Sequence, residues 1–312
     1  MCAVRPIAVS LIALLSMAQA RSSPPDLQGV WAFATLTPLE RPAEFEGKPF
    51  VSEAEAAAWV DQQLERNNRD RRDGGAAVDV GRAVNDFWFE RGTALASLDG
   101  KRMTSMIVDP PDGKLPPLTP PARERAAARA ADNREHPADH PENRSLQERC
   151  LAFNAGPPIQ VGPYNNFVQI LQTRDHVVIH NEMIHDARVI PIGDAPHVSS
   201  TIRQYFGDSR GHWEGDTLVV DVTNFPTTGI NYRGATGALH LTERFRRIDA
   251  RTVRYEVTVE DPATFGKPWT AALQLRTDPR ITDVYEYACH EGNYAMRNIL
   301  SGARSAEGGE KK

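Results

Sequence analysis

The second half of the chain consists of short runs in which apolar and polar residues alternate, separated by turn-forming residues. Such an alternation is typical of β-strands that bury one face. No helical pattern lies between the runs to supply a crossover connection, so neighbouring strands should pair in antiparallel fashion. Strands are expected at 167–172, 176–183, 186–192, 201–206, 217–223, 238–248, 252–260, 268–276 and 283–289.

A Gly-x-Trp sequence, Gly29 to Trp31, opens the first expected strand of the chain. Together with the consecutive antiparallel strands, it resembles the lipocalin-like, or calycin, architecture. A meander with this many strands has no exposed edge when it closes on itself. We therefore expect a mainly β fold, an antiparallel lipocalin-like β-barrel with helical insertions and a C-terminal helix.

Residues 21–304 are expected to form this single barrel domain. Between residues 51 and 150 the pattern changes to helices and loops, which should form an insertion. Within it, residues 93–98 and 101–108 flank Asp99-Gly100, a favoured two-residue hairpin turn. Ser52 and Glu55 make a capping box at the start of one helix, and Thr119 caps a second helix that begins with Pro120 and Pro121. Residues 305–312 are rich in Glu and Lys and should form a disordered tail.

The first twenty residues have the pattern of a cleavable secretory signal peptide. Arg5 precedes an apolar run from Ile7 to Met17, and Ala18 to Ala20 supply a small-x-small cleavage pattern. A membrane anchor is the alternative, but it needs about 20 consecutive apolar residues. We expect residues 1–20 to be removed and the mature protein to be periplasmic or secreted, with no insertion into a membrane.

Export bears on the two remaining cysteines, Cys150 and Cys289. An oxidising compartment allows them to form a disulfide, and an even count leaves no unpaired thiol. Two separate buried thiols are the alternative, because a free cysteine packs as a small apolar residue.

Charge and motifs limit the partners. The formal net charge is −5, whereas a nucleic-acid partner would favour a basic surface. The chain contains no dinucleotide fingerprint, phosphate-binding loop, nucleophile elbow or His-Glu-x-x-His motif. We expect no cofactor and no nucleic acid, and a small molecule as ligand or substrate; the sequence leaves the oligomeric state open.

Glu243 is an anomaly in the expected hairpin 238–260. A three-residue turn would place His240 opposite Glu260 and Arg244 opposite Glu256 on a polar, solvated face. Glu243 instead lies on the apolar face, where burial raises the pKa of a carboxyl group. It is a candidate general base, or else it forms an ion pair with an arginine such as Arg188 or Arg203.

A second set of candidates lies between His180 and Asp186. A histidine beside a carboxylate, as in His185 and Asp186, is the usual arrangement for acid–base chemistry. Such residues could also bind zinc, with His290 and Glu291 as further ligands, but their spacing matches no metal motif. The remaining alternative is a set of polar groups at a turn and an edge strand.

The third set surrounds Asp208, Ser209 and Arg210, in a loop bounded by glycines. These side chains could simply hold their own turn together. Alternatively, Arg203 and Arg210, together with Arg188, could bind a carboxylate or phenolate group of a ligand. Aromatic residues such as Trp213, Trp269 and Tyr287 belong to the core or line a flat apolar pocket.

Several longer sequences carry a second resemblance: EMIHDAR at 182–188, GDSRG at 207–211, WEGDTLVV at 213–220 and YEYACHEGNY at 285–294. On these the chain resembles, along its full length, an uncharacterised family of exported bacterial proteins. The resemblance implies export, but it transfers no catalytic residue.

Three functions are consistent with these residues. The first is a cofactor-independent acid–base enzyme, a lyase or isomerase acting on a small aromatic molecule, with catalytic residues among His185, Asp186, Glu243 and His290. The second is a non-catalytic periplasmic carrier of a hydrophobic ligand. The third is a metal-dependent hydrolase. Convergence of two of His185, Glu243 and His290 in one cavity would favour the enzyme.

Overall fold

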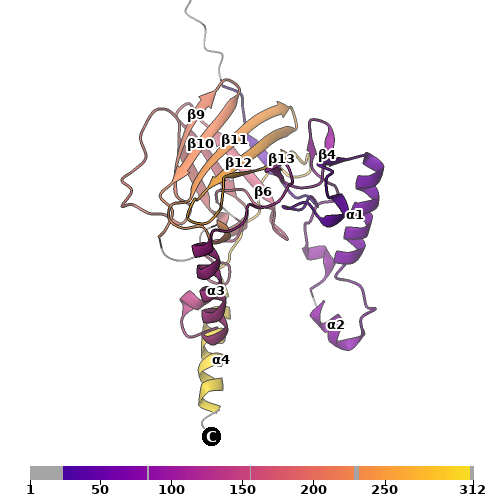
Figure 1. The fold of residues 1–312 in the computed structure, drawn as a ribbon, viewed down its shortest axis with the longest axis vertical. Helices are drawn as coiled ribbons and strands as arrows, with labels where there is room; N and C mark the ends of the chain where they lie inside the picture. Colours follow the sequence, from indigo (N-terminus) through magenta and orange to yellow (C-terminus); the bar gives the residue numbers. More distant parts are fainter. Residues whose placement is uncertain (1–23, 83, 155, 228–231, 310–312) are drawn as a thin grey trace, which may run out of the picture.

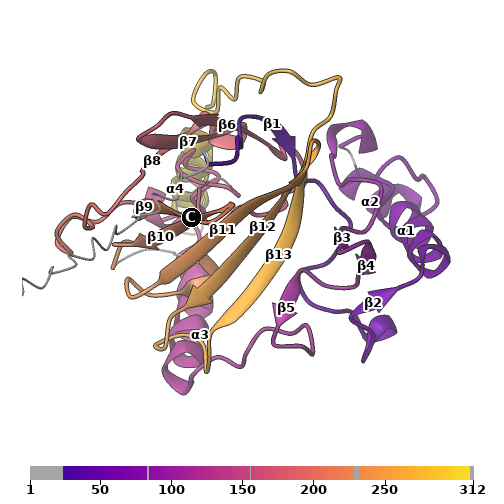
Figure 2. The same cartoon turned by 90° about the horizontal axis from the view of Figure 1, so that it is seen from above.

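Ten antiparallel strands form one strongly curved sheet in the computed structural model (Figures 1 and 2). The structure describes residues 24–82, 84–154, 156–227 and 232–309, so the expected signal peptide lies outside it. The sheet follows the order β8 (Ala187–Pro191), β7 (His176–Asn181), β6 (Phe167–Gln172), β1 (Gly29–Ala32), β13 (Trp269–Arg276), β12 (Thr252–Glu260), β11 (His240–Asp249), β10 (Thr217–Thr223) and β9 (Asp208–Glu214), with β5 (Ile107–Asp109) paired to β13.

The sheet is not closed into a barrel, so that part of the expectation is wrong. β8 and β9 are its two ends, and an isolated parallel bridge between Ile192 and Gly211 joins them. The Gly193 amide also donates to the Gly211 carbonyl at 2.9 Å. Because the two edges run in the same direction where they meet, they cannot form the antiparallel ladder that would close the meander.

Two expected strands are absent from the described sheet, and one strand was missed. Residues 201–206 lie in the loop between β8 and β9, and 283–289 follow β13 outside the sheet. β9 contains Gly211, where a Cβ atom would lie 2.6 Å from Cδ1 of Ile192. A sequence with polar residues and a glycine at this close approach is typical of a loop, which is why it was not recognised.

The hairpin of β11 and β12 confirms the expected register. His240 pairs with Glu260, Arg244 with Glu256 and Arg246 with Arg254. The ion pairs do not join the residues that lie opposite each other on β11 and β12. Arg244 instead binds Glu214 at 2.6 Å, and Arg254 binds Glu256 at 2.8 Å.

The main core lies on the inner face of the curved sheet. Its largest buried side chains include Trp31, Phe245, Tyr255 and Trp269. Burial of such side chains contributes about 1.5–3 kcal/mol each. The core therefore follows from the alternating pattern even though the sheet stays open.

The insertion at 51–150 contains the expected helices and loops, and the expected hairpin around Asp99-Gly100 is confirmed by the pairing of Ser97–Leu98 with Lys101–Met103. A small sheet of β2 (Phe50–Val51), β4 (Lys101–Met103) and β3 (Ser97–Leu98) has its own core with α1 (Glu53–Asn67). α1 begins at the expected capping box of Ser52 and Glu55. α2 (Gly75–Gly81) follows α1, and both lie beside the large sheet (Figure 1).

Two further helices extend from the same end of the sheet, α3 (Pro120–Glu135) and α4 (Ala295–Gly309) (Figure 1). α4 continues to Gly309, so helix replaces the first part of the expected tail. No helix among the described residues is long and apolar enough to cross a bilayer.

The expected disulfide between Cys150 and Cys289 is confirmed, with the two Cα atoms 5.7 Å apart. It joins the segment before β6 to the segment after β13, 139 residues further along the chain. Because 283–289 is not a strand, the bond fixes the route of an irregular segment.

Candidate functional site

A cavity of about 380 Å³ opens on the core-facing side of β12 and β13. Its walls come from the segment after β1, from Arg91 and Met106, from the loop before β6, from a short 3-10 helix before β11, and from the two strands. Its lining is mostly apolar. The lining residues include Leu36, Leu39, Met106, Ile159, Val161, Tyr232, Arg233, Tyr255, Val257, Ala271 and Leu273.

Behind the cavity lies an interior row of three side chains, Arg188, Glu243 and Tyr255. Nη1 of Arg188 lies 2.5 Å from Oε2 of Glu243, and the Tyr255 hydroxyl donates to Oε1 at 2.7 Å. Glu243 is 0% exposed. Arg188 was one of the two arginines that the sequence offered as its ion-pair partner, so this alternative is confirmed.

The interior row has little capacity for proton transfer. Both oxygens of Glu243 bind Arg188, and the Tyr255 oxygen accepts from the Ile159 amide at 3.0 Å. Burial, followed by the charge of Glu243, raises the pKa of Tyr255 well above its ordinary value. The row is therefore a neutralised pair with a protonated phenol, which matches a buried structural ion pair.

A groove of about 560 Å³ separates the open edges β8 and β9. Asp186 and Arg188 line it from one side, and Asp208 and Ser209 from the other. Arg188 thus lines the groove while Tyr255 lines the cavity, and Glu243 joins them across the interior.

The polar face of β9 to β12 carries the histidine–carboxylate network, Asp208, His197, Asp221, His240 and Glu260. His197 lies 2.7 Å from each of Asp208 and Asp221. His240 lies 2.5 Å from Asp221 and 3.0 Å from Glu260. The hydrogen bonds alternate between rings and carboxylates along the whole network.

The hydrogen bond with Asp221 raises the pKa of His240, and the same bond lowers the pKa of Asp221. Both ring nitrogens of His240 face carboxylates, which accept hydrogen bonds only, so a doubly protonated ring satisfies them. Arg210 adds a further cation 3.2 Å from Asp208. When His240 is protonated, its charge and that of Arg210 offset two of the three carboxylates of the network.

The turn after β7 holds His185 at the surface, with its ring edge-on to His180 at a centroid distance of 4.4 Å. Ile184 and His185 are both left-handed, with φ of 63° and 58°, and this conformation is costly for a β-branched residue. Burial, followed by the charge of His185, lowers the pKa of His180. The carboxylate of Asp186 lines the groove.

Glu182, in the same turn, is a buried carboxylate with an unusual environment. It is 3% exposed, and its Oε2 has no hydrogen-bond partner among the described residues. Burial and then the charge of Glu90 raise the pKa of Glu182. Burial also raises the pKa of Glu90, which accepts from the Asn166 amide at 2.9 Å.

The proposed catalytic residues do not converge. Glu243 is in the core, His185 is in the turn after β7, and His290 is exposed beside Cys150 and the disulfide. The structure does bring Glu243 together with Arg188, and Asp208 with Arg210.

The other proposed ligand-binding residues are scattered. Arg203 donates to the carbonyls of Phe225 and Gly237, so it holds a loop. Trp213 and Trp269 pack in or against the main core. Burial, followed by a contact with Tyr164, raises the pKa of Tyr287, which lies after β13.

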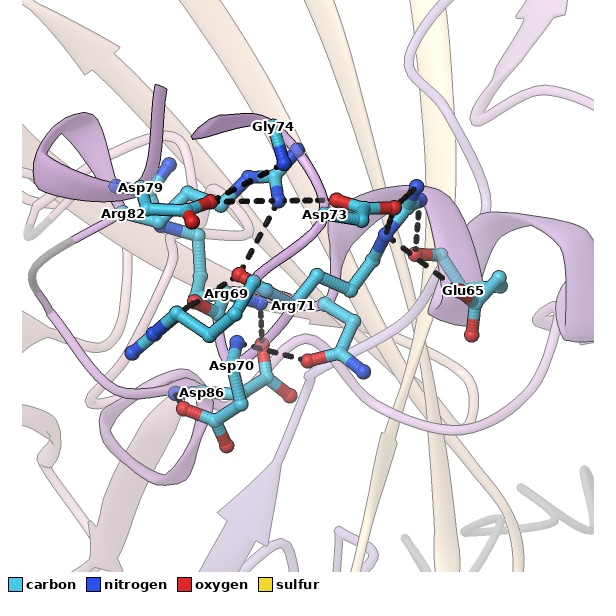
Figure 3. A network of polar contacts seen from close by, with 11 residues as sticks. Glu65, Arg69, Asp70, Arg71, Asp73, Gly74, Asp79, Arg82 and Asp86 are labelled. Atoms are coloured by element: carbon cyan, nitrogen blue, oxygen red, sulfur yellow. Dashed lines mark hydrogen bonds and ion pairs between the residues drawn. The ribbon is translucent and has the colours of Figure 1, made fainter. Parts of the chain in front are cut away.

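A separate network of charges braces the connection between α1 and the segment after α2 (Figure 3). Arg71 and Arg82 both bind Asp73, and Arg82 also lies 3.6 Å from Asp79. The Arg71 hydrogen bond lowers the pKa of Asp73. Asp73 is exposed and the other three side chains are partly buried, and their charges neutralise one another locally, so they hold the loop rather than form a site.

Sequence reasoning missed His197, Asp221, Tyr232 and Arg233. His197 and Arg233 lie in irregular segments, where no alternation assigns a direction to the side chain. Asp221 had a usable signal, because it shares a face of β10 with Val219 and Thr217 beside the polar face of β11. No three His, Cys, Asp or Glu side chains in the described parts of the chain are placed to hold a metal ion.

Comparison of the chain with protein-family models finds no match, and comparison with curated proteins finds no significant relative. The resemblance to an exported bacterial family therefore stays a prediction.

Proposed function

We propose that this protein binds a small, largely apolar molecule in the cavity beside β12 and β13. The observation that carries the proposal is the cavity itself, about 380 Å³ with mainly aliphatic and aromatic walls. Small-molecule sites are typically concave, apolar and about 300–1,000 Å³ in volume. Because Tyr232 and Tyr255 contribute to the walls, an aromatic ligand fits the lining best.

Binding has more support than acid–base catalysis. A general base must lie within hydrogen-bond reach of the substrate, whereas Glu243 is fully buried and does not line the cavity. Tyr255, the member of the row that lines the cavity, already donates its proton to Glu243. The disulfide is consistent with an oxidising compartment, so we propose a periplasmic or secreted carrier.

Fluorescence titration with N-phenyl-1-naphthylamine, a neutral aromatic probe, tests the proposal. The wild-type protein should give a saturable increase in probe fluorescence. Ala271→Phe should abolish it, because Ala271 lines the cavity and the larger side chain fills it. Gln274→Phe places the same ring on the other face of β13 and is the matched control. A wild-type protein without saturable binding, or equal binding by both variants, would overturn the proposal.

A further inference from the structure

Two adjacent residues give the cavity a polar end. Tyr232 and Arg233 form part of the short 3-10 helix at Tyr232–Gly234, and both line the cavity. Nε of Arg233 donates to the Tyr232 hydroxyl oxygen at 3.3 Å. The guanidinium carbon also lies 5.5 Å from the centre of the Tyr232 ring. The phenol and the guanidinium are therefore held together at one wall.

The Tyr232 hydroxyl retains a proton to donate. Burial raises the pKa of Tyr232, so the phenol stays neutral at physiological pH. Its oxygen already accepts from Arg233, and no acceptor for its own proton lies in the described part of the chain. The Tyr232 hydroxyl can therefore donate a hydrogen bond to a ligand in the cavity.

Arg233 is also the cation that lacks a carboxylate. The other arginine of the lining, Arg91, lies 2.7 Å from Asp86 and 4.0 Å from the centre of the Phe89 ring. Arg188, behind the cavity, is neutralised by Glu243. Within the described residues, Arg233 forms no ion pair, and its remaining N–H groups are available.

We infer that the ligand of this cavity is an apolar carboxylate, with its carboxylate group bound by the Tyr232 hydroxyl and the Arg233 guanidinium. This inference rests on the proposed function. The apolar body would lie against Val257, Ala271 and Leu273, which carry no charge. A carboxylate accepts several charge-assisted hydrogen bonds at once, and arginine is the side chain best suited to supply them.

A competition experiment with a matched pair of ligands tests this step. 2-Naphthoate and 2-naphthamide have the same ring system and differ in the charge of the carboxyl substituent. Each is used to displace N-phenyl-1-naphthylamine from the wild-type protein. Two charge-assisted hydrogen bonds should make the carboxylate bind about tenfold more tightly than the amide.

Two variants assign the preference to the proposed residues. Arg233→Gln and Tyr232→Phe should each reduce the ratio of the 2-naphthoate affinity to the 2-naphthamide affinity by about threefold or more. Arg246→Gln, which removes the same charge from the exposed end of β11, should keep the wild-type ratio.

The outcomes separate the two proposals. Equal affinity for 2-naphthoate and 2-naphthamide, with the neutral probe still bound, would overturn the carboxylate inference and leave the binding function standing. A preference that survives in Arg233→Gln would overturn the assignment to Arg233. If the wild-type protein shows no saturable binding of the probe, the binding function itself is contradicted.

Discussion

Glu243 and Glu182 are both buried carboxylates, but their surroundings are opposite. Glu243 faces the guanidinium of Arg188 and the hydroxyl of Tyr255. Among the described residues Glu182 forms no ion pair and its Oε2 has no hydrogen-bond partner. Burial and the charge of Glu90 disfavour its anion more than its hydrogen bonds, such as that with Asn165, favour it. The same residue type should therefore stabilise the fold at one position and destabilise it at the other.

For Glu182, a raised pKa in the folded state means that the folded protein binds more protons than the unfolded chain above about pH 4.3. The free energy of unfolding then falls as pH rises through this window. Glu182→Gln removes the charge and should increase stability at pH 7 by about 1 kcal/mol. Urea unfolding of both proteins from pH 5 to pH 8 measures the difference.

Glu214→Gln is the control for this experiment. Glu214 is exposed, and its hydrogen bond with Arg244 lowers its pKa, so its substitution should not increase stability at pH 7. A Glu182→Gln protein that is less stable than the wild type at pH 7 would show that the Glu182 anion is needed in the fold.

For Glu243, the single substitution Glu243→Leu should be strongly destabilising, because it leaves the Arg188 charge buried without a partner. Removal of one member of a buried ion pair costs about 3–5 kcal/mol. The double variant Arg188→Met with Glu243→Leu should recover most of this loss. Guanidinium unfolding of the two single variants and the double variant gives the coupling energy, and additive losses would contradict a direct pair.

Among the elements, the loop between β8 and β9 depends on the histidine–carboxylate network. His197 belongs to this loop and binds Asp208 and Asp221 on the sheet. Asn224 also donates to the carbonyl groups of Val198 and Ser199. The loop continues into Tyr205 and Phe206, which line the groove, so the network sets how this side of the sheet is covered.

This network predicts a pH dependence. The pKa of His240 is raised, so its stabilising contribution is complete below the unfolded value of about 6.5 and is lost as pH rises through the folded value. His240→Gln should therefore lose stability relative to the wild type at pH 6 and approach it at pH 9. Because the side chain is 36% exposed, the difference at pH 6 should be at most about 1 kcal/mol.

Thermal unfolding across this pH range measures the effect. The groups that face His240 are Asp221 and Glu260, and His197 and Asp208 follow on the far side of Asp221. His212 is an exposed histidine on β9, so the variant His212→Gln should show the same dependence of stability on pH as the wild type. A His240→Gln profile parallel to that of the wild type would show that the network does not respond to this proton.

At the scale of the whole molecule, the disulfide ties together segments that the open sheet leaves apart. Cys150 lies between β5 and β6, and Cys289 follows β13, the last strand of the sheet. A bond across 139 residues restricts the unfolded chain and should contribute about 4–5 kcal/mol. The double variant Cys150→Ala with Cys289→Ala should lose about this amount.

Thermal unfolding with and without dithiothreitol checks this prediction. The reductant should lower the melting temperature of the wild type and leave that of the double variant unchanged. If the reduced and the oxidised wild-type proteins have the same melting temperature, the disulfide contributes nothing to stability.

Local patterns in the sequence were sufficient for several parts of this fold. The alternation from 167 onward predicted most strands of the sheet, their antiparallel pairing and the β11–β12 register from His240 to Arg246. The three-residue turn at 249–251 was wrong, because Asp249 pairs with Thr252 after an irregularity between Arg247 and Asp249. Capping residues predicted the start of α1 at Ser52 and of α3 at Thr119. The cysteine count predicted the pairing of Cys150 with Cys289. Each of these depends on neighbours in sequence or on a count.

Tertiary structure decided the rest. Whether the sheet closes depends on the directions in which β8 and β9 meet, and these follow from the whole curvature of the sheet. Residues far apart along the chain come together in the walls of the cavity and in two contacts, Arg188 with Glu243 and His197 with Asp221. The alternation of apolar and polar residues and the turn residues predict which face of the sheet a side chain lies on. Which residue it contacts there depends on how the whole chain packs.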